Sequence, residues 1–329
     1  MDKEYLLEVK NLKTYFKVGK SIVKAVDGVS FNLESGKTFA IVGESGSGKS
    51  ITALSIMGLL PTNIAESNRG IINFEDNNLL EFSEKNMRQI RGNKISMIFQ
   101  EPMTSLNPVY NLSFQISETI MLHQKKSKSE ARKIAIEMLD LVGIPEPQKR
   151  IDSYPHELSG GMRQRAMIAM ALSCNPKILI ADEPTTALDV TIQAQILSLM
   201  QDLQKKLGMS IIFITHDLGV VSEISDTVMV MYLGNVVEIA NTKELFSNPL
   251  HTYTRSLIDI APQISAEKRK IKILKGEIPS PIDPPSGCVF RTRCPTPTHN
   301  CKEGLSQMGL VEAIPGHWVD KCCAECAKL

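Results

Sequence analysis

The sequence lacks an excess of charge of either sign and lacks any long apolar run. Lys and Arg number 37 and Asp and Glu 36 in 329 residues, so the formal net charge is +1. Nothing in the overall charge favours nucleic acid as a partner, and we expect none. No run of about 18 apolar residues is present, so we expect no segment that spans a bilayer. The start, Met1–Glu4, carries acids where a secretory leader is basic and then apolar, and we expect a protein that stays in the cytosol.

Cysteine is scarce in the body of the chain and concentrated near its end. Of seven cysteines only Cys174 precedes residue 288, so a disulfide scaffold is excluded and reduced thiols are expected. Repeated prolines in the same tail predict no regular helix or central strand there. We place a domain boundary within residues 258–275, where a charged stretch leads out of the main domain. The tail holds Cys288, Cys294, Cys301, Cys322, Cys323 and Cys326, and Pro279, Pro281, Pro284, Pro285, Pro295 and Pro297.

Residues 1–257 alternate short apolar runs with helix-like periodic segments, which is typical of an α/β layered domain. Two successive helical stretches over 112–142 indicate a helical insert, which we extend to about residues 101–175. There is no internal repeat. The predicted strands are Leu6–Val9, Ser30–Leu33, Thr38–Val42, Ile71–Phe74, Ile95–Phe99, Ile178–Ala181, Ile211–Thr215, Thr227–Tyr232 and Val236–Ile239. The predicted helices follow Gly48 and cover about 112–123, 128–142, 159–174 and 190–207.

A glycine-rich loop, Gly43–Ser50, matches the phosphate-loop pattern G-x-x-x-x-G-K-[ST]. It follows the apolar run Phe39–Val42 and precedes a helical segment, which is the strand–loop–helix context that the motif requires. Backbone N–H groups of such a loop surround phosphate oxygens, and the helix adds its positive N-terminal end. We expect Lys49 to neutralise the β and γ phosphates of a nucleotide and the Ser50 hydroxyl to bind Mg²⁺.

An apolar run that ends in two acids, Lys177–Glu183, indicates the second half of a nucleotide site. At the end of such a strand, Asp182 can hold the metal, and Glu183 can orient or deprotonate the attacking water. Alone, this pattern is also a common strand-to-loop exit. Together with the loop at Lys49, it favours nucleotide hydrolysis.

The segment Leu158–Gln164 opens a predicted helix with Ser159 as its N-cap, followed by Gly160 and Gly161. In isolation this is an ordinary capped helix. Taken with the two preceding motifs, the segment closely resembles the signature motif of the ATP-binding-cassette (ABC) ATPases. The resemblance to this family spans roughly residues 5–257. The resemblance implies a P-loop NTPase fold of the ABC cassette type. That fold has a RecA-like core, an antiparallel β subdomain and a helical subdomain, followed here by a small Cys- and Pro-rich extension over 258–329.

The resemblance also implies roles for single residues. Phe16, with Tyr15 as the alternative, matches the aromatic that stacks on adenine, and Gln100 matches the glutamine that senses Mg²⁺. Asp189 matches the loop that communicates across a dimer, and His216 matches the switch histidine at the γ-phosphate. The implied catalytic residues are Glu183, His216 and Gln100, and the implied Mg²⁺ ligands are Ser50, Gln100 and Asp182. The implied ATP contacts are Phe16, Gly43, Ser45, Gly46, Ser47, Gly48, Lys49, Ser50, Ile51, Asp182, Ser159, Gly160, Gly161 and Asp189.

Three further stretches resemble the ATPases of oligopeptide and dipeptide importers, in particular the D-type subunit: Gln100–Pro108, Tyr154–Gly161 and Pro284–Pro295. The resemblance implies ATP-driven peptide uptake, a peripheral location on the cytoplasmic side of the cell membrane, and a docking surface near residues 101–142. The implied partners are a second, non-identical cassette that sandwiches two ATP molecules with this chain, two integral membrane permease subunits, and an extracellular or periplasmic solute-binding protein. An importer of nickel or another small solute is the first alternative. A soluble cassette protein acting on nucleic acid or ribosomes is the second.

Four tail cysteines, Cys288, Cys294, Cys301 and Cys322, supply enough thiolates for a tetrahedral metal or an iron–sulfur cluster. Some relatives with this pattern carry a [4Fe–4S] cluster, and the resemblance implies one here. The spacings differ from those of ferredoxins and zinc fingers, so Zn²⁺ and unligated thiols stay open, as does Cys323 or Cys326 as the fourth ligand. A bound metal would give a short, proline-rich tail a physical reason to be ordered, and could make it a redox or metal sensor.

Overall fold

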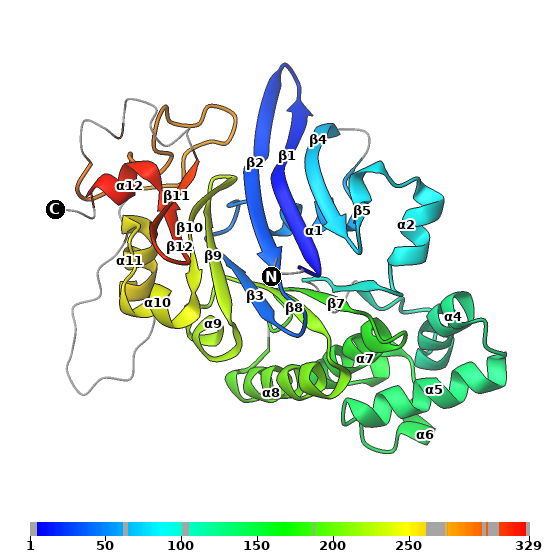
Figure 1. Cartoon of the computed structure of the whole chain (residues 1–329). Helices are drawn as coiled ribbons and strands as arrows, with labels where there is room; N and C mark the ends of the chain where they lie inside the picture. Colours follow the sequence, from blue (N-terminus) through cyan, green and yellow to red (C-terminus); the bar gives the residue numbers. More distant parts are fainter. Residues whose placement is uncertain are drawn as a thin grey trace, which may run out of the picture. The chain divides into compact units, whose positions relative to one another are not determined.

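The computed structural model describes residues 5–61, 65–100, 105–186, 188–260, 274, 276–297, 301 and 309–326 (Figure 1). Its contacts divide the chain into two compact units. The first contains Met1–Glu34, Thr38–Glu81 and Ile214–Leu329, and the second contains Ser35–Lys37 and Phe82–Phe213. Residues 261–273 and 275, on which most of the expected domain boundary falls, lie outside the described ranges, so that boundary stays a prediction.

The first unit begins with an antiparallel sheet of strand order β2-β1-β4-β5. The long strands β1 (Leu7–Val18) and β2 (Ser21–Leu33) form a hairpin in which Leu7 lies opposite Leu33. Alternate apolar side chains of β1 are buried, as expected for a strand with one face on a core. The sheet is completed by β4 (Ala65–Phe74) and β5 (Asn77–Asn78), and the 3₁₀ helix η1 (Leu79–Glu81) follows.

A second sheet of the first unit has the order β11-β12-β10-β9-β3. β3 (Thr38–Val42) is buried along its whole length and lies parallel to β9 (Thr227–Tyr232). β10 (Asn235–Asn241) is antiparallel to β9, and the C-terminal strands β12 (His317–Asp320) and β11 (Leu310–Ile314) continue the sheet beyond β10. The helices described in this unit are α1 (Lys49–Met57), α9 (Leu218–Ile224), α10 (Thr242–Ser247), α11 (Thr252–Ile260) and α12 (Lys321–Cys326).

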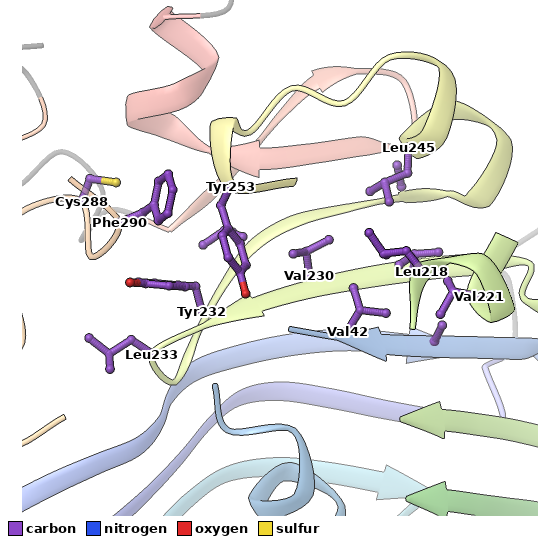
Figure 2. Close-up of a cluster of buried hydrophobic side chains, with 14 of the residues drawn as sticks. Val42, Leu218, Val221, Val230, Tyr232, Leu233, Leu245, Tyr253, Cys288 and Phe290 are labelled. Atoms are coloured by element: carbon purple, nitrogen blue, oxygen red, sulfur yellow. The ribbon is translucent and has the colours of Figure 1, made fainter. Parts of the chain in front are cut away.

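The C-terminal extension shares the hydrophobic core of the first unit. In Figure 2, Phe290 lies beside Tyr232 and Tyr253, and its ring centroid is 5.3 Å and 5.2 Å from theirs. Aromatic rings at such separations and tilted angles attract one another in addition to burying apolar area. Phe290 is 1% exposed and belongs to the same cluster as Val230 and Cys288. The extension has little apolar material of its own, and apolar side chains such as Phe290 are buried by packing into the core of the body.

In the second unit the strand order is β8-β7-β6. β6 (Ile95–Ile98) and β7 (Ile178–Asp182) are parallel, with Ile98 opposite Ala181. β8 (Ser210–Thr215) begins in this unit, and its last two residues belong to the first. None of the helices described in either unit combines the length and the apolar character needed to cross a bilayer. Those of the second unit include α2 (Glu84–Ile90), α4 (Leu112–Gln124), α5 (Lys128–Leu141), α6 (Pro147–Arg150), η2 (Pro155–Glu157), α7 (Gly160–Leu172) and α8 (Val190–Leu207).

The predicted strands and helices of the body are present, and they form a mixed α/β architecture as predicted. β1, β2 and β4 are longer than predicted, because half-exposed hairpin strands carry many polar residues and shifts of register interrupt their alternation. The short helices α2, α9, α10 and α11 and the C-terminal elements were not predicted. Residues 276–297 form no helix or strand, as the proline pattern predicts.

Candidate functional site

The loop of residues 43–50 joins β3 to α1 in the first unit, and neighbouring backbone packs closely around it. Gly48 has a φ of +102°, and a Cβ there would lie 2.5 Å from the carbonyl oxygen of Ala25. A Cβ at Gly43 would collide with the carbonyl oxygen of Met231. Both positions therefore require glycine. Gly48 is the N-cap of α1 and has no side chain with which to cap the first N–H groups of this helix, which suits a phosphate site.

The Lys49 side chain is folded back onto this loop. It is 5% exposed, and its Nζ donates hydrogen bonds to the carbonyl oxygens of Gly43, at 2.7 Å, and Glu44, at 3.0 Å. The Ser47 Oγ is buried and has no hydrogen-bond partner among the described residues. A buried hydroxyl of this kind is available to a ligand oxygen, so the loop fits a nucleotide phosphate. Of the other predicted contacts, Ser50 and Ile51 are half-buried, and Ser45 and Gly46 are exposed.

His216 lies between the end of β8 and the start of α9, and it is exposed. The next residue, Asp217, caps α9, because its Oδ1 accepts hydrogen bonds from the N–H groups of Gly219, at 2.9 Å, and Val220, at 3.3 Å. The backbone on either side of His216 is therefore fixed by a strand and a capped helix. The structure places His216 in the unit that contains the phosphate loop. Its role at the γ-phosphate stays a prediction.

Both candidate adenine-stacking aromatics lie in β1. Phe16 is 8% exposed, whereas Tyr15 is half-buried. The Tyr15 hydroxyl donates to Asp27 Oδ1 at 2.6 Å, and burial together with this bond raises the pKa of Tyr15. Stacking on a base requires an accessible ring face, so Tyr15 meets this requirement better than Phe16 in this conformation. The assignment stays a prediction for either residue.

In the second unit, Gln100 and Glu183 are in contact. Gln100 Nε2 donates to Glu183 Oε2 at 3.2 Å, although the two residues are 83 positions apart. The contact follows from the parallel pairing of β6 and β7, because the carboxyl ends of parallel strands meet at the same edge of a sheet. Two residues predicted from separate motifs are thus brought together.

The Glu183 backbone is in the left-handed region, with a φ of +46°. Non-glycine residues rarely adopt this conformation, and they do so preferentially at functional sites. Glu183 Oε2 also accepts a hydrogen bond from Thr186 Oγ1 at 3.0 Å, and Gln164 Nε2 donates to the carbonyl oxygen of Pro184. Asp182, the last residue of β7, is 5% exposed. The motifs assign no role to either donor: Thr186 lies outside them, and Gln164 is the last residue of the segment Leu158–Gln164 but was given no contact.

Two helix N-termini of the second unit carry the remaining predicted contacts. Ser159 Oγ accepts a hydrogen bond from the N–H of Met162 at 3.3 Å and caps α7, while Gly160 is exposed. Asp189 Oδ1 accepts from the N–H of Ile192 at 2.9 Å and caps α8. A Cβ at Gly161 would lie 3.1 Å from Ile192 Cγ2, so the start of α7 lies against the start of α8. Ser159 and Asp189 are thus N-caps, and their contacts across a dimer stay predictions.

The tail cysteines are gathered in the first unit. Cys288, Cys301 and Cys322 are buried in its core cluster, and Cys294 packs against that cluster. The Sγ atoms of Cys301 and Cys322 are 3.4 Å apart. Burial raises the pKa of Cys288 to about 12, so this thiol is protonated at neutral pH. Within the described part of the chain, no three His, Cys, Asp or Glu side chains are arranged to hold a metal ion, and this arrangement does not support the predicted [4Fe–4S] cluster.

Comparisons with known proteins agree with this geometry. The profile of the family described as "ABC transporter" matches residues 26–186, and the profile described as "Oligopeptide/dipeptide transporter, C-terminal region" matches residues 237–301. The chain is 56% identical to the oligopeptide transport ATP-binding protein AppD of Bacillus subtilis (strain 168) over 296 residues, 90% of each chain. It is 48% identical over 305 residues to the dipeptide transport ATP-binding protein DppD of Haemophilus influenzae, 92% of each chain.

A solved structure extends the comparison to three dimensions. The ATP-binding cassette MJ0796, a dimer in a post-hydrolysis state with bound ADP and Pi, has a TM-score of 0.64 and 28% identity to this chain, covering 72% of this chain and 98% of the other. The chain therefore belongs to the ABC transporter family of ATPases, which couple ATP hydrolysis to transport. Within that family, it is of the oligopeptide/dipeptide transporter type.

Proposed function

We propose that this chain is the ATP-hydrolysing subunit of an importer that carries oligopeptides or dipeptides across the cytoplasmic membrane, bound peripherally on its cytoplasmic side. The observation that carries the proposal is the similarity to AppD, which extends over 90% of both chains and includes the phosphate loop and the C-terminal region. Nickel or another small solute is the alternative cargo.

Different residues have different roles in the proposed hydrolysis. The loop around Lys49 binds the phosphates, and Ser50, Asp182 and Gln100 would hold Mg²⁺, which neutralises charge on the phosphates when bound. Glu183 accepts a proton from the attacking water. Its carboxylate is oriented for this by the hydrogen bonds that Gln100 and Thr186 donate.

A second cassette completes the nucleotide-binding site. α7 begins with Ser159 and two glycines and exposes its N-terminus, which favours negative charge. MJ0796, a solved cassette similar to this chain, is a dimer. We propose that the α7 N-terminus of each cassette covers the ATP bound by the other, with a related but non-identical cassette as the partner.

An exposed apolar surface at the start of α4 is suited to a membrane partner. Val109, Tyr110 and Phe114 are 69%, 44% and 46% exposed, and the Tyr110 and Phe114 rings stack with centroids 4.4 Å apart. The buried Gln115 side chain holds this loop in place, since its Nε2 donates to the carbonyl oxygens of Asn107, at 3.0 Å, and Tyr110, at 2.7 Å. We propose that this surface docks onto the pair of integral membrane permease subunits, which receive solute from an extracellular or periplasmic solute-binding protein.

Reconstitution of the assembled complex tests the proposed function. The chain is co-expressed with its partner cassette and permease subunits, purified, and placed in liposomes with MgATP and the solute-binding protein. We expect uptake of labelled dipeptides or oligopeptides that depends on ATP and on the solute-binding protein. Uptake of Ni²⁺ but not of peptide would assign the alternative cargo. RNA retained through a high-salt wash, with no membrane subunit, would contradict an importer.

We also propose that Cys288, Cys294, Cys301 and Cys322 bind a [4Fe–4S] cluster, with Zn²⁺ as the alternative. What supports the proposal is the proximity of the four thiols, which all belong to or pack against one hydrophobic core cluster. For binding, the four sulfurs have to rearrange around the metal and lose their protons. Because this happens only in the folded extension, metal binding would stabilise it. A bound cluster would supply a redox-sensitive cross-link.

Anaerobic purification tests the cluster. We expect absorption at about 400 nm with bound iron and sulfide, lost in Cys288→Ser and Cys294→Ser and kept in Cys174→Ser, whose thiol lies in the other unit. Stoichiometric zinc without visible absorption would assign the alternative metal. A protein that is free of both metals under these conditions would show that the thiols are unligated.

A further inference from the structure

An ion pair joins the phosphate loop to the C-terminal extension of the same unit. Arg293 Nη1 lies 2.5 Å from Glu44 Oε2, and Arg293 Nη2 donates to Glu44 Oε1 at 3.1 Å. The Arg293 side chain is 5% exposed and the Glu44 side chain 30%. This is the two-pronged geometry that makes arginine–carboxylate pairs strong and directional. The pair is more than an exposed surface contact, because the guanidinium is buried.

Glu44 is a central residue of the loop. Its N–H donates to the hydroxyl of Tyr253 at 2.9 Å, and its carbonyl oxygen accepts hydrogen bonds from Lys49 Nζ at 3.0 Å and from the N–H of Ser47 at 3.2 Å. A displacement of Glu44 therefore moves a carbonyl that holds Lys49. Arg293 fixes the side chain of this residue, so its effect reaches the lysine expected to bind phosphate.

The position of Arg293 is set by the extension. The N–H groups of Arg293 and Cys294 donate to the carbonyl oxygen of Phe290 at 2.9 Å and 3.0 Å. The Phe290 ring is buried against Tyr232 and Tyr253 (Figure 2), and the Arg293 guanidinium lies over the Tyr232 ring, 5.8 Å from its centroid. The extension thus presents a fixed cation to the loop, one residue before Cys294.

Charge gives this contact a consequence for nucleotide binding. A carboxylate within a loop that binds a triphosphate repels it unless a cation neutralises the carboxylate. We propose that Arg293 is a positioning residue for ATP. It holds and neutralises Glu44, so the C-terminal extension sets the affinity of the phosphate loop. The inference rests on the proposed function, since it takes this loop to bind MgATP.

A set of variants tests the role of Arg293. The dissociation constant for MgATP is measured on the purified full chain, and KM and kcat on the assembled complex. We expect Arg293→Gln to raise the dissociation constant and KM about 10-fold, with a change in kcat below about 3-fold. Arg293→Lys, which keeps the charge but not the two-pronged geometry, is expected to recover part of the affinity. Arg291→Gln is the matched control, because Arg291 lies two residues before Arg293 and its Nη2 donates to Ser286 Oγ at 3.1 Å.

The double variant distinguishes electrostatic positioning from a general structural role. Adding Glu44→Gln to Arg293→Gln removes the unpaired carboxylate, so affinity is expected to return to within about 3-fold of the unmodified chain. The inference would be overturned if Arg293→Gln, shown by circular dichroism to be folded, binds MgATP with normal affinity. It would also be overturned if the double variant binds MgATP as weakly as Arg293→Gln. An unmodified chain that does not bind MgATP would instead contradict the proposed function.

Discussion

Glu183→Gln is expected to lower the rate of ATP hydrolysis about 100- to 10,000-fold while MgATP binding is retained. Gln has the size of Glu and can still accept the hydrogen bonds that Gln100 Nε2 and Thr186 Oγ1 donate to Glu183 Oε2, at 3.2 Å and 3.0 Å. Gln is also no more strained than Glu by the left-handed backbone at this position, which has a φ of +46°. What the amide cannot do is accept a proton from water. The substitution therefore separates chemistry from binding.

The measurements for Glu183→Gln are phosphate release by the assembled complex and the dissociation constant for MgATP. A closed dimer of cassettes is expected to accumulate with MgATP, detected by size-exclusion chromatography, because hydrolysis no longer opens it. Glu277→Gln is the control, since Glu277 is exposed in the extension. Turnover within 10-fold of the unmodified complex would show that Glu183 is not the base.

The contact between Gln100 and Glu183 shows how far the sequence could be used to predict the site. Each residue follows an apolar strand, and parallel strands that alternate with helices end at the same edge of a sheet. The strands were predictable because β7 is buried along its whole length and reads as a continuous apolar run. The hydrogen bond itself was not predictable, because it depends on which strands are neighbours and on side-chain conformation.

Arg293 illustrates the opposite case. It lies within the stretch Pro284–Pro295 that resembles the importer ATPases, but that resemblance assigns it no contact. The segment has no helix or strand, and Glu44 is 249 positions away, so local periodicity could not predict the pair. The same holds for Phe290, whose burial depends on a core built by β9 and α11. Helices such as α9 and α10, which are 7 and 6 residues long, were missed because fewer than two turns carry too little periodicity to recognise. Long-range packing is therefore the part that the sequence does not reveal.

Lys49→Met is expected to weaken MgATP binding at least about 100-fold and to abolish hydrolysis. The Lys49 side chain is 5% exposed, and its ammonium group is held by the carbonyl oxygens of Gly43 and Glu44. Burying a charge costs free energy that a bound phosphate recovers, because an ion pair replaces the lost water. Met keeps most of the length and apolar character of the stem, so the loop should keep its fold while the charge is lost.

The measurements for Lys49→Met are the dissociation constants for MgATP and MgADP and the rise in melting temperature that nucleotide produces. That rise is expected to disappear in Lys49→Met and to persist in the control Lys20→Met, since Lys20 is exposed in the turn between β1 and β2. Glu183→Gln and Lys49→Met thus stop the same reaction at different steps, one after nucleotide is bound and one before. Normal affinity in Lys49→Met would mean that the loop is not where phosphate binds, and the inference about Arg293 would lose its basis as well.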